Sequence, residues 1–189
     1  MRQVWDSWGD VLVVWALAVP MLIVGAGLVF RARVRQGRAP EQAFRDTAAE
    51  AGILGGTLPW VWMILTPADG ERQVILVPLR DLFETLTEAS SNTVVQVTAN
   101  MVLFLPLGFL LPLRFPRCAG VLRMTLVGAG LSASLEIAQY VLDLGRYTSI
   151  DDVLMNAAGA GIGAYLARSH SRRAAPDRSY SARILAKIG

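Results

Sequence analysis

The hydrophobic positions of this chain gather into five blocks that have the length of membrane-spanning helices. A span needs roughly 20 mostly apolar residues, with 17 to 25 tolerated. The blocks cover residues 10–30, 53–67, 97–113, 121–142 and 150–167. The last two are polar for spans, and buried helices of a soluble protein are the alternative for them. Five such blocks leave too little polar covering for a soluble protein. The pattern therefore predicts an all-α fold, a polytopic membrane bundle of five transmembrane helices.

The basic residues fall mainly on one side of this predicted bundle when its connections alternate sides. Of the 18 Lys and Arg residues, 14 lie on that side: Arg31, Arg33, Arg35, Arg38, Arg45, Arg114, Arg117, Arg123, Arg168, Arg172, Arg173, Arg178, Arg183 and Lys187. Most of the acidic residues lie on the other side. The positive-inside rule then predicts a multi-pass membrane protein with its N-terminus outside and its C-terminus in the cytoplasm. The leader MRQVWDSWGD lacks a basic n-region, so we expect the first helix to be retained.

Three connecting or terminal segments have helical character of their own. Residues 78–89 (PLRDLFETLTEA) predict an amphipathic helix on the outer membrane surface, either an interfacial anchor or a cover over a site. Its apolar stripe consists of Leu79, Leu82, Phe83 and Leu86. Residues 179–189 (SYSARILAKIG) predict an amphipathic cytoplasmic tail on the inner leaflet. Residues 39–52 are expected to form a separate short cytoplasmic helix with Pro40 in its first turn.

Composition removes several classes of protein. Hydrophobic residues make up 53% of the chain and charged residues 17%, which argues against a disordered chain, a coiled coil and a secreted disulfide scaffold. A single cysteine, Cys118, forms no internal disulfide, and a single histidine, His170, leaves no His/Cys zinc site. We expect no metal and no cofactor. The sequence pI of about 9.5 suggests nucleic acid, but the basic residues bracket membrane helices, so no nucleic-acid partner is expected.

The last three blocks carry polar side chains that hydrocarbon disfavours. Ser132, Glu136 and Gln139 are spaced i, i+4, i+7 and share one helix face. Asp152 and Asn156 lie one turn apart on the next helix, followed on the same stripe by Gly159 and Gly163, and Asn100 enters the third block near its outer end.

These side chains are predicted to meet at one depth. At 1.5 Å per residue, Glu136 and Asn156 each lie roughly 9 Å below the outer end of their helices. The polar layer then occupies the outer third of the membrane, and its rim consists of Arg146, Asp151 and Asp152. An ionised carboxylate there costs several kcal/mol unless paired. We therefore expect Glu136 to face the bundle with Gln139, Arg146 or Asn156 as its partner.

The segments around this layer resemble a known family. They are ILVPLRDL (75–82), NMVLFLPLGFLLPL (100–113), SLEIAQY (134–140) and RYTSIDDVLMNAAGAGIGAYL (146–166). Their order and spacing are similar to the VanZ-like family of bacterial membrane proteins over about residues 53–167. By this resemblance the family's signature positions are Asn100, Phe104, Pro106, Gly108, Ser134, Glu136, Gln139, Arg146, Asp151, Asp152, Asn156 and Gly159. Leu79 stands where the family usually has phenylalanine.

The resemblance also implies a division of the chain. Residues 1–50 look like an added N-terminal transmembrane helix and basic loop, since the family usually has four spans. Residues 51–168 are the expected VanZ-like membrane domain, and residues 169–189 the expected basic cytoplasmic tail.

The favoured functional hypothesis is a binding protein with a polar pocket in the outer leaflet. The family's namesake is linked to resistance against teicoplanin, a lipidated glycopeptide, which implies a role in teicoplanin resistance or cell-envelope homeostasis. The expected partner is a membrane lipid or a lipidated small molecule, with Arg146 binding an anionic group. The predicted ligand-binding residues are Asn100, Ser134, Glu136, Gln139, Arg146, Asp152 and Asn156.

Three alternatives remain beside it. The first is an intramembrane enzyme acting on a lipid-linked cell-wall precursor, with Glu136 as general acid or base and Asp151 and Asp152 as further catalytic candidates. Adjacent helical residues point about 100° apart, so the two aspartates do not easily share one metal. The second is a purely structural polar cluster that cross-links helices at roughly 0.6 to 2 kcal/mol per bond. The third, a transporter or channel, lacks a visible inverted repeat. The oligomeric state is left open.

Overall fold

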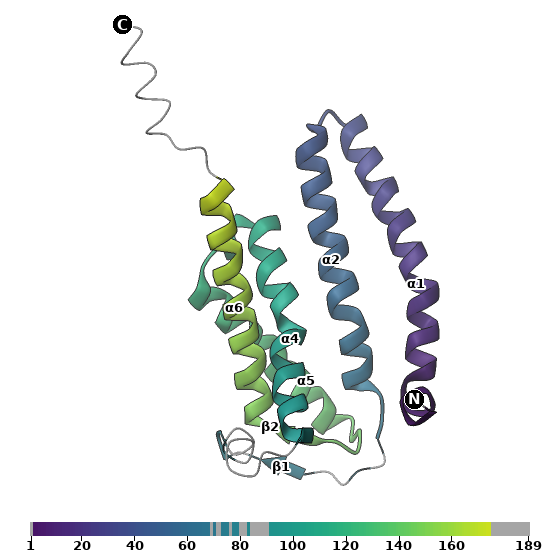
Figure 1. Ribbon diagram of the computed structural model, residues 1–189, viewed down its shortest axis with the longest axis vertical. Coiled ribbons are helices and arrows are strands. Elements are labelled where there is room, and N and C mark those ends of the chain that lie inside the picture. Colours follow the sequence, from purple (N-terminus) through teal and green to yellow (C-terminus); the bar gives the residue numbers. More distant parts are fainter. Residues whose placement is uncertain are drawn as a thin grey trace, which may run out of the picture.

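The computed structural model describes residues 2–68, 70, 73–75, 77–79, 83 and 91–174. In this part of the chain five long helices run side by side (Figure 1): α1 (Arg2–Arg35), α2 (Pro40–Leu65), α4 (Ser91–Arg114), α5 (Val121–Val141) and α6 (Ile150–Ala174). Successive helices run in opposite directions. The α1–α2 turn, the α4–α5 connection and the end of α6 therefore lie at one end of the bundle, called the basic end below. The opposite end, called the strand end, holds β1 and β2.

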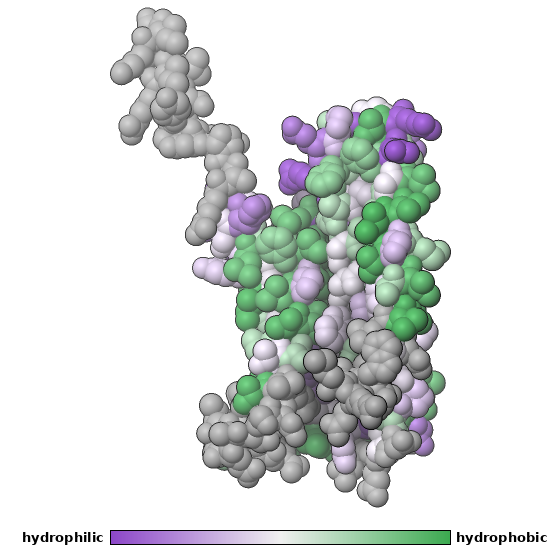
Figure 2. All heavy atoms as spheres, turned by 45° about the vertical axis from the view of Figure 1, so that its right-hand side comes forward, coloured by the Kyte–Doolittle hydropathy of each residue, from purple (hydrophilic) through white to green (hydrophobic). Residues whose placement is uncertain are grey.

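Four of these helices are long and apolar enough to cross a membrane. Within the described ranges the candidate spans are Val13–Arg35, Pro40–Leu65, Val97–Arg114 and Val121–Val141. Figure 2 shows hydrophobic residues along the visible sides of the helices and hydrophilic residues gathered at the basic end. The prediction of an all-helical, membrane-type bundle is thereby confirmed for four of the five blocks.

The fifth block, α6, falls outside this set because its first turns are polar and its middle is rich in small residues. It packs against α4 and α5. Buried alanines at 157, 160, 164 and 167 form much of its packed face, whereas Leu154, Ile162 and Tyr165 are exposed. Small side chains allow close packing but add little hydropathy, so α6 is less apolar than the other helices.

Glycines let α4 and α6 approach until their backbones touch. A Cβ atom at Gly159 would collide with the backbone of Met101, and one at Gly163 with the backbone of Leu105. From the other helix, Gly108 faces the backbone of Ala160 in the same way. Small residues one helical turn apart allow this close approach of two helices.

The prediction of a separate short helix over residues 39–52 is wrong. One continuous helix, α2, runs from Pro40 to Leu65, with Pro40 in its first turn as expected. The segment contains no residue that stops a helix, and Gly52 is accommodated because the side chain of Leu110 on α4 packs directly over it.

A short pair of strands ties the connections at the strand end together. Strand β1 (Gln73–Ile75) pairs in parallel with β2 (Tyr147–Ser149), and Val74 lies opposite Thr148. Sequence reasoning found no strand pattern, because three residues are too few to display the alternation that marks a strand.

At the basic end a carboxylate joins three helices. Glu50 on α2 accepts hydrogen bonds from both Arg33 on α1, at 2.8 Å, and Arg114 on α4, at 2.5 Å. Arg33 also donates to the hydroxyl of Thr47 at 2.8 Å. The connection from α4 to α5 passes through a short 3-10 helix, η1 (Pro116–Cys118). Two predicted amphipathic segments lie outside the described residues. They are residues 179–189 and residues 78–89, of which only Pro78, Leu79 and Phe83 are described.

The close contact of α4 and α6 gives a testable expectation. Gly163→Ala places a methyl group against the α4 backbone and should lower stability by about 1–3 kcal/mol, the usual cost of overpacking. Gly130→Ala on α5 is the matched control, because a Cβ there meets nothing within 4 Å. Thermal unfolding of the detergent-purified variants measures both. Equal midpoints for the two variants would contradict the backbone contact.

Candidate functional site

A polar cavity of about 440 Å³ lies at the strand end of the bundle, between α2, α4, α5 and α6. Its lining consists of Ile64, Ala68, Gly70, Asn100, Glu136, Gln139, Gly145, Arg146, Tyr147, Asp152 and Asn156. Six of the predicted ligand-binding residues are in this set: Asn100, Glu136, Gln139, Arg146, Asp152 and Asn156. Residues from separate helices and from the α5–α6 turn therefore meet around one space.

Ser134, the remaining predicted ligand residue, does not belong to this group. Its side chain is exposed, and its hydroxyl donates to the carbonyl of Gly130 on the same helix at 2.7 Å. Two residues of α-helix rotate the side chain by about 200°, so Ser134 points away from the face that carries Glu136. The structure thus does not bring Ser134 together with the other six residues.

The buried face of α5 follows the predicted spacing. Ser132, Glu136 and Gln139 are all buried, at 1%, 9% and 7% exposure. Ser132 accepts a hydrogen bond from the side-chain amide of Asn156 on α6 at 2.8 Å. This bond joins α5 to α6 at the inner limit of the cavity.

Glu136 has a different partner from those expected. Its carboxylate accepts a hydrogen bond from the backbone N–H of Ser149 at 3.2 Å. Gln139 and Arg146, two of the predicted partners, donate to α2 instead. The α5–α6 turn carries Arg146 beneath the end of α2, where carbonyl groups compete for its guanidinium.

Arg146 and Gln139 cap the C-terminal end of α2. The guanidinium of Arg146 donates to the carbonyls of Met63 and Thr66, both at 3.0 Å, and the amide of Gln139 donates to Ile64 at 2.9 Å. The last carbonyls of a helix have no partner inside the helix and carry partial negative charge, so a cation there is favourable.

Sequence reasoning missed this capping role, although a signal existed. The last turn of α2 contains no basic residue. In an apolar surrounding every backbone group needs a partner, so a span that ends without its own donors requires them from elsewhere.

The loops that close the cavity pass each other at backbone distance. The N–H of Ala68 donates to the carbonyl of Leu144 at 2.8 Å. Gly145 has a φ of +62°, a conformation that favours glycine, and a Cβ atom there would collide with the carbonyl of Ala68. Gly70 in turn faces the carbonyl of Gly145. A side chain at either glycine would push the two loops apart.

The start of α6 is held by a cap and a buried carboxylate. Ser149 is the N-cap, and its hydroxyl accepts the N–H of Asp151 at 3.2 Å. Asp151 is 2% exposed and accepts the backbone N–H of Leu79 at 2.5 Å. Leu79 has a φ of +63°, which is strained for a branched side chain. Asp151 therefore fixes the connection before α4 onto α6.

Asp152 points in another direction from Asp151. It accepts a hydrogen bond from the side-chain amide of Asn100 on α4 and lines the cavity, whereas Asp151 does not line it. The 100° step between adjacent helical residues explains why the two carboxylates serve different neighbours. The pattern Ser-x-x-Asp at residues 149–152 is typical of a helix start, so the sequence itself indicates Ser149 as the N-cap of α6.

The cavity contains two buried acceptors without a partner. The side-chain oxygens of Gln139 and Asn156 are buried and have no hydrogen-bond partner among the described residues. Their amide nitrogens donate to Ile64 and Ser132. The carboxyl group of Glu136 also lines the cavity.

The chain belongs to the VanZ/LLP1 family. The sequence model of that family matches residues 55–171, which include the whole cavity lining. Helix α1 and the first part of α2 lie outside the match. A search of curated proteins and a search of solved structures each give no match. The fold and the family together define a VanZ-like membrane protein.

The capping of α2 predicts the effect of losing Arg146. Arg146→Ala leaves the carbonyls of Met63 and Thr66 without these donors and should cost about 1.5–3 kcal/mol of stability. Arg117→Ala is the control, because its side chain is exposed in η1. Thermal unfolding gives the global effect, and hydrogen exchange should show lost protection in the last turn of α2. Unchanged exchange there would rule out the capping role.

Proposed function

We propose that the polar cavity binds the head group of an amphiphile whose tails remain in the membrane. The carrying observation is that six polar side chains from three helices and one turn surround a single space. Two of them, Gln139 and Asn156, keep a buried acceptor oxygen without a partner among the described residues. Leaving such an atom unpaired costs about 1–3 kcal/mol, which a bound donor would recover.

The hydrogen-bond inventory favours a head group that donates. Amines and hydroxyl groups match the unpartnered oxygens of Gln139 and Asn156 and the carboxyl group of Glu136. Recognition of an anion by Arg146, the sequence-based expectation, is weaker support, because this guanidinium already donates to two α2 carbonyls. Lipid head groups and lipidated glycopeptides both carry such donors, and a role in teicoplanin resistance or cell-envelope homeostasis follows from this binding.

The proposed topology sets the cavity in the outer leaflet. All five helices cross the membrane, and α6 packs there against α4 and α5. The basic end faces the cytoplasm, because arginines of α1, α4, α5 and α6 gather there, and the N-terminus lies outside.

A second candidate function is catalysis on a lipid-linked cell-wall precursor. The observation in its favour is that Glu136 and Asp152 bring two carboxyl groups from α5 and α6 to one cavity. Glu136 would act as general acid or base on a substrate bound there. Asp151 is a weaker catalytic candidate, since its carboxylate is buried against Leu79. New products after incubation of purified protein with cell-wall lipids would favour this function.

Teicoplanin susceptibility tests the binding function. Cells that express Asn156→Leu or Glu136→Gln protein should lose protection, because each change removes a hydrogen-bond acceptor from the cavity. The expected loss is about tenfold in affinity per strong hydrogen bond. Ser134→Ala is the matched control on the exposed face of α5 and should protect like the unmodified protein.

The stability of these variants distinguishes ligand binding from a purely structural role of the polar cluster. Lost protection with unchanged expression and unfolding midpoint supports binding, whereas protection that falls only in step with stability supports the structural alternative. Full protection by both cavity variants would remove the proposal.

The single cysteine tests the topology. Cys118 lies in η1 at the basic end, and the chain contains no other cysteine. A membrane-impermeant maleimide should leave Cys118 unlabelled in intact cells and label it after permeabilisation. In a Cys118→Ser background, Leu142→Cys at the exposed start of the α5–α6 turn should be labelled in intact cells. The reverse pattern would overturn the proposed orientation.

A further inference from the structure

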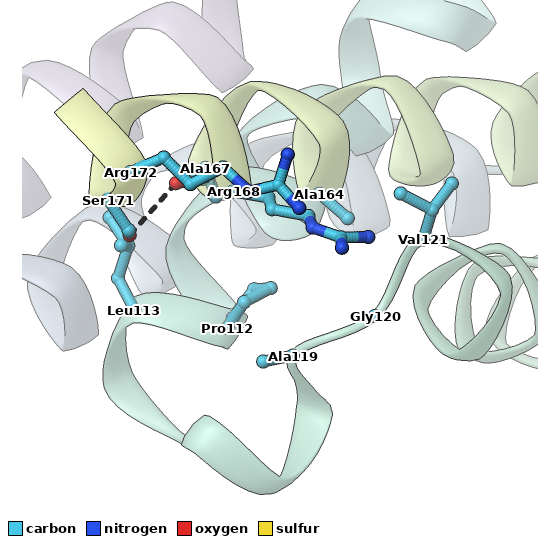
Figure 3. Close-up of a pocket in the computed structure, with 10 residues that line it drawn as sticks. All are labelled: Pro112, Leu113, Ala119, Gly120, Val121, Ala164, Ala167, Arg168, Ser171 and Arg172. Carbon is cyan, nitrogen blue, oxygen red and sulfur yellow. Dashed lines mark hydrogen bonds between the residues drawn. The ribbon is translucent and has the colours of Figure 1, made fainter.

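A second cavity, of about 580 Å³, lies at the basic end of the bundle, away from the polar cavity. Its walls come from the end of α4, the loop before α5 and the last turns of α6 (Figure 3). The lining residues are Pro112, Leu113, Ala119, Gly120, Val121, Ala164, Ala167, Arg168, Ser171 and Arg172. None of these residues belongs to the polar constellation described above.

The inner wall of this cavity is apolar and its mouth is basic. Ala164 and Ala167 are buried, at 3% and 2% exposure, and no acidic side chain lines the space. Arg168 and Arg172 are exposed and lie one helical turn apart on the α6 wall, across the cavity from Pro112 and Ala119 in Figure 3. This arrangement combines an apolar surface with two neighbouring positive charges.

The two guanidinium groups are available to a ligand. Within the part of the chain that the structure describes, no carboxylate forms an ion pair with Arg168 or Arg172. Arg33 and Arg114 at the same end are, by contrast, both engaged with Glu50. An arginine pair without acidic partners suits a phosphate group, because each guanidinium fork donates two parallel hydrogen bonds to phosphate oxygens.

The start of α5 also favours an anion at this place. Helix α5 begins at Val121, and its N-cap, Gly120, supplies no side-chain acceptor for the first backbone N–H groups. Both residues line the cavity, so the positive end of the α5 dipole lies beside the two arginines. An adjoining cavity of about 660 Å³ shares Leu113 and Ser171 and continues towards α2, past Phe44 and Leu110.

We propose that this cavity binds the phosphate of an anionic phospholipid, with Arg168 and Arg172 holding the phosphate and the apolar wall receiving the upper part of an acyl chain. Basic pockets between membrane helices bind anionic head groups in this manner. The inference depends on the chain lying in a membrane, and it is independent of any ligand of the polar cavity. Free phosphate offers the same chemistry, so the experiment distinguishes free phosphate from the lipid.

Native mass spectrometry of the full chain in detergent tests the proposal. Phosphatidylglycerol is titrated against phosphatidylcholine, and the number and affinity of bound lipids are compared. The unmodified protein should retain one phosphatidylglycerol with about tenfold preference over phosphatidylcholine, and Arg168→Gln/Arg172→Gln should abolish this preference. Arg31→Gln/Arg35→Gln is the matched control, since it removes two exposed arginines with the same spacing from the same end.

Inorganic phosphate forms the second arm. If phosphate at millimolar concentration displaces the lipid completely, or binds as tightly without it, the site recognises free phosphate and the lipid assignment is overturned. The assignment also fails if the control variant loses phosphatidylglycerol as strongly as Arg168→Gln/Arg172→Gln. Retained preference in the control, with loss only in the cavity variant, supports the proposal, and unfolding midpoints confirm that both variants are folded.

Discussion

The direct contact between the backbones of α4 and α6 is the constraint on which the rest of the structure depends. At Gly108, Gly159 and Gly163 no side chain separates the two backbones. The helices are therefore close enough for short side chains such as Asn100 and Asp152 to bond across the gap. Between helices in lipid there is no hydrophobic force, so close packing and such bonds hold the bundle together. The polar cavity opens at the end where this contact begins.

The polar residues of the cavity bond to other parts of the protein. Arg146 and Gln139 donate to the last carbonyls of α2, and Asn156 donates to the hydroxyl of Ser132. The side-chain oxygens of Gln139 and Asn156 remain buried without a partner among the described residues. The residues that pair the carbonyls at the end of α2 thus also determine which ligand groups the cavity can bind.

The sequence predicted what depends on local periodicity and missed what depends on distant chain segments. Block lengths located the helices, and the i, i+4, i+7 spacing found the buried face of α5 with Ser132 and Glu136. Ser134 was included because of the family resemblance, although its two-residue offset from Glu136 places it on the other side of the helix. Pairing of β1 with β2 and the use of Arg146 on α2 join residues more than 70 positions apart, for which a single sequence carries no periodic signal.

Glu50 on α2 lies just before residue 55, where the match to the family begins. Its carboxylate is compensated twice, by Arg33 from α1 and by Arg114 from α4. Without α1, Glu50 would still form a neutral pair with Arg114, and no uncompensated charge would remain between helices. The first helix is thus not required to balance charge within the rest of the bundle.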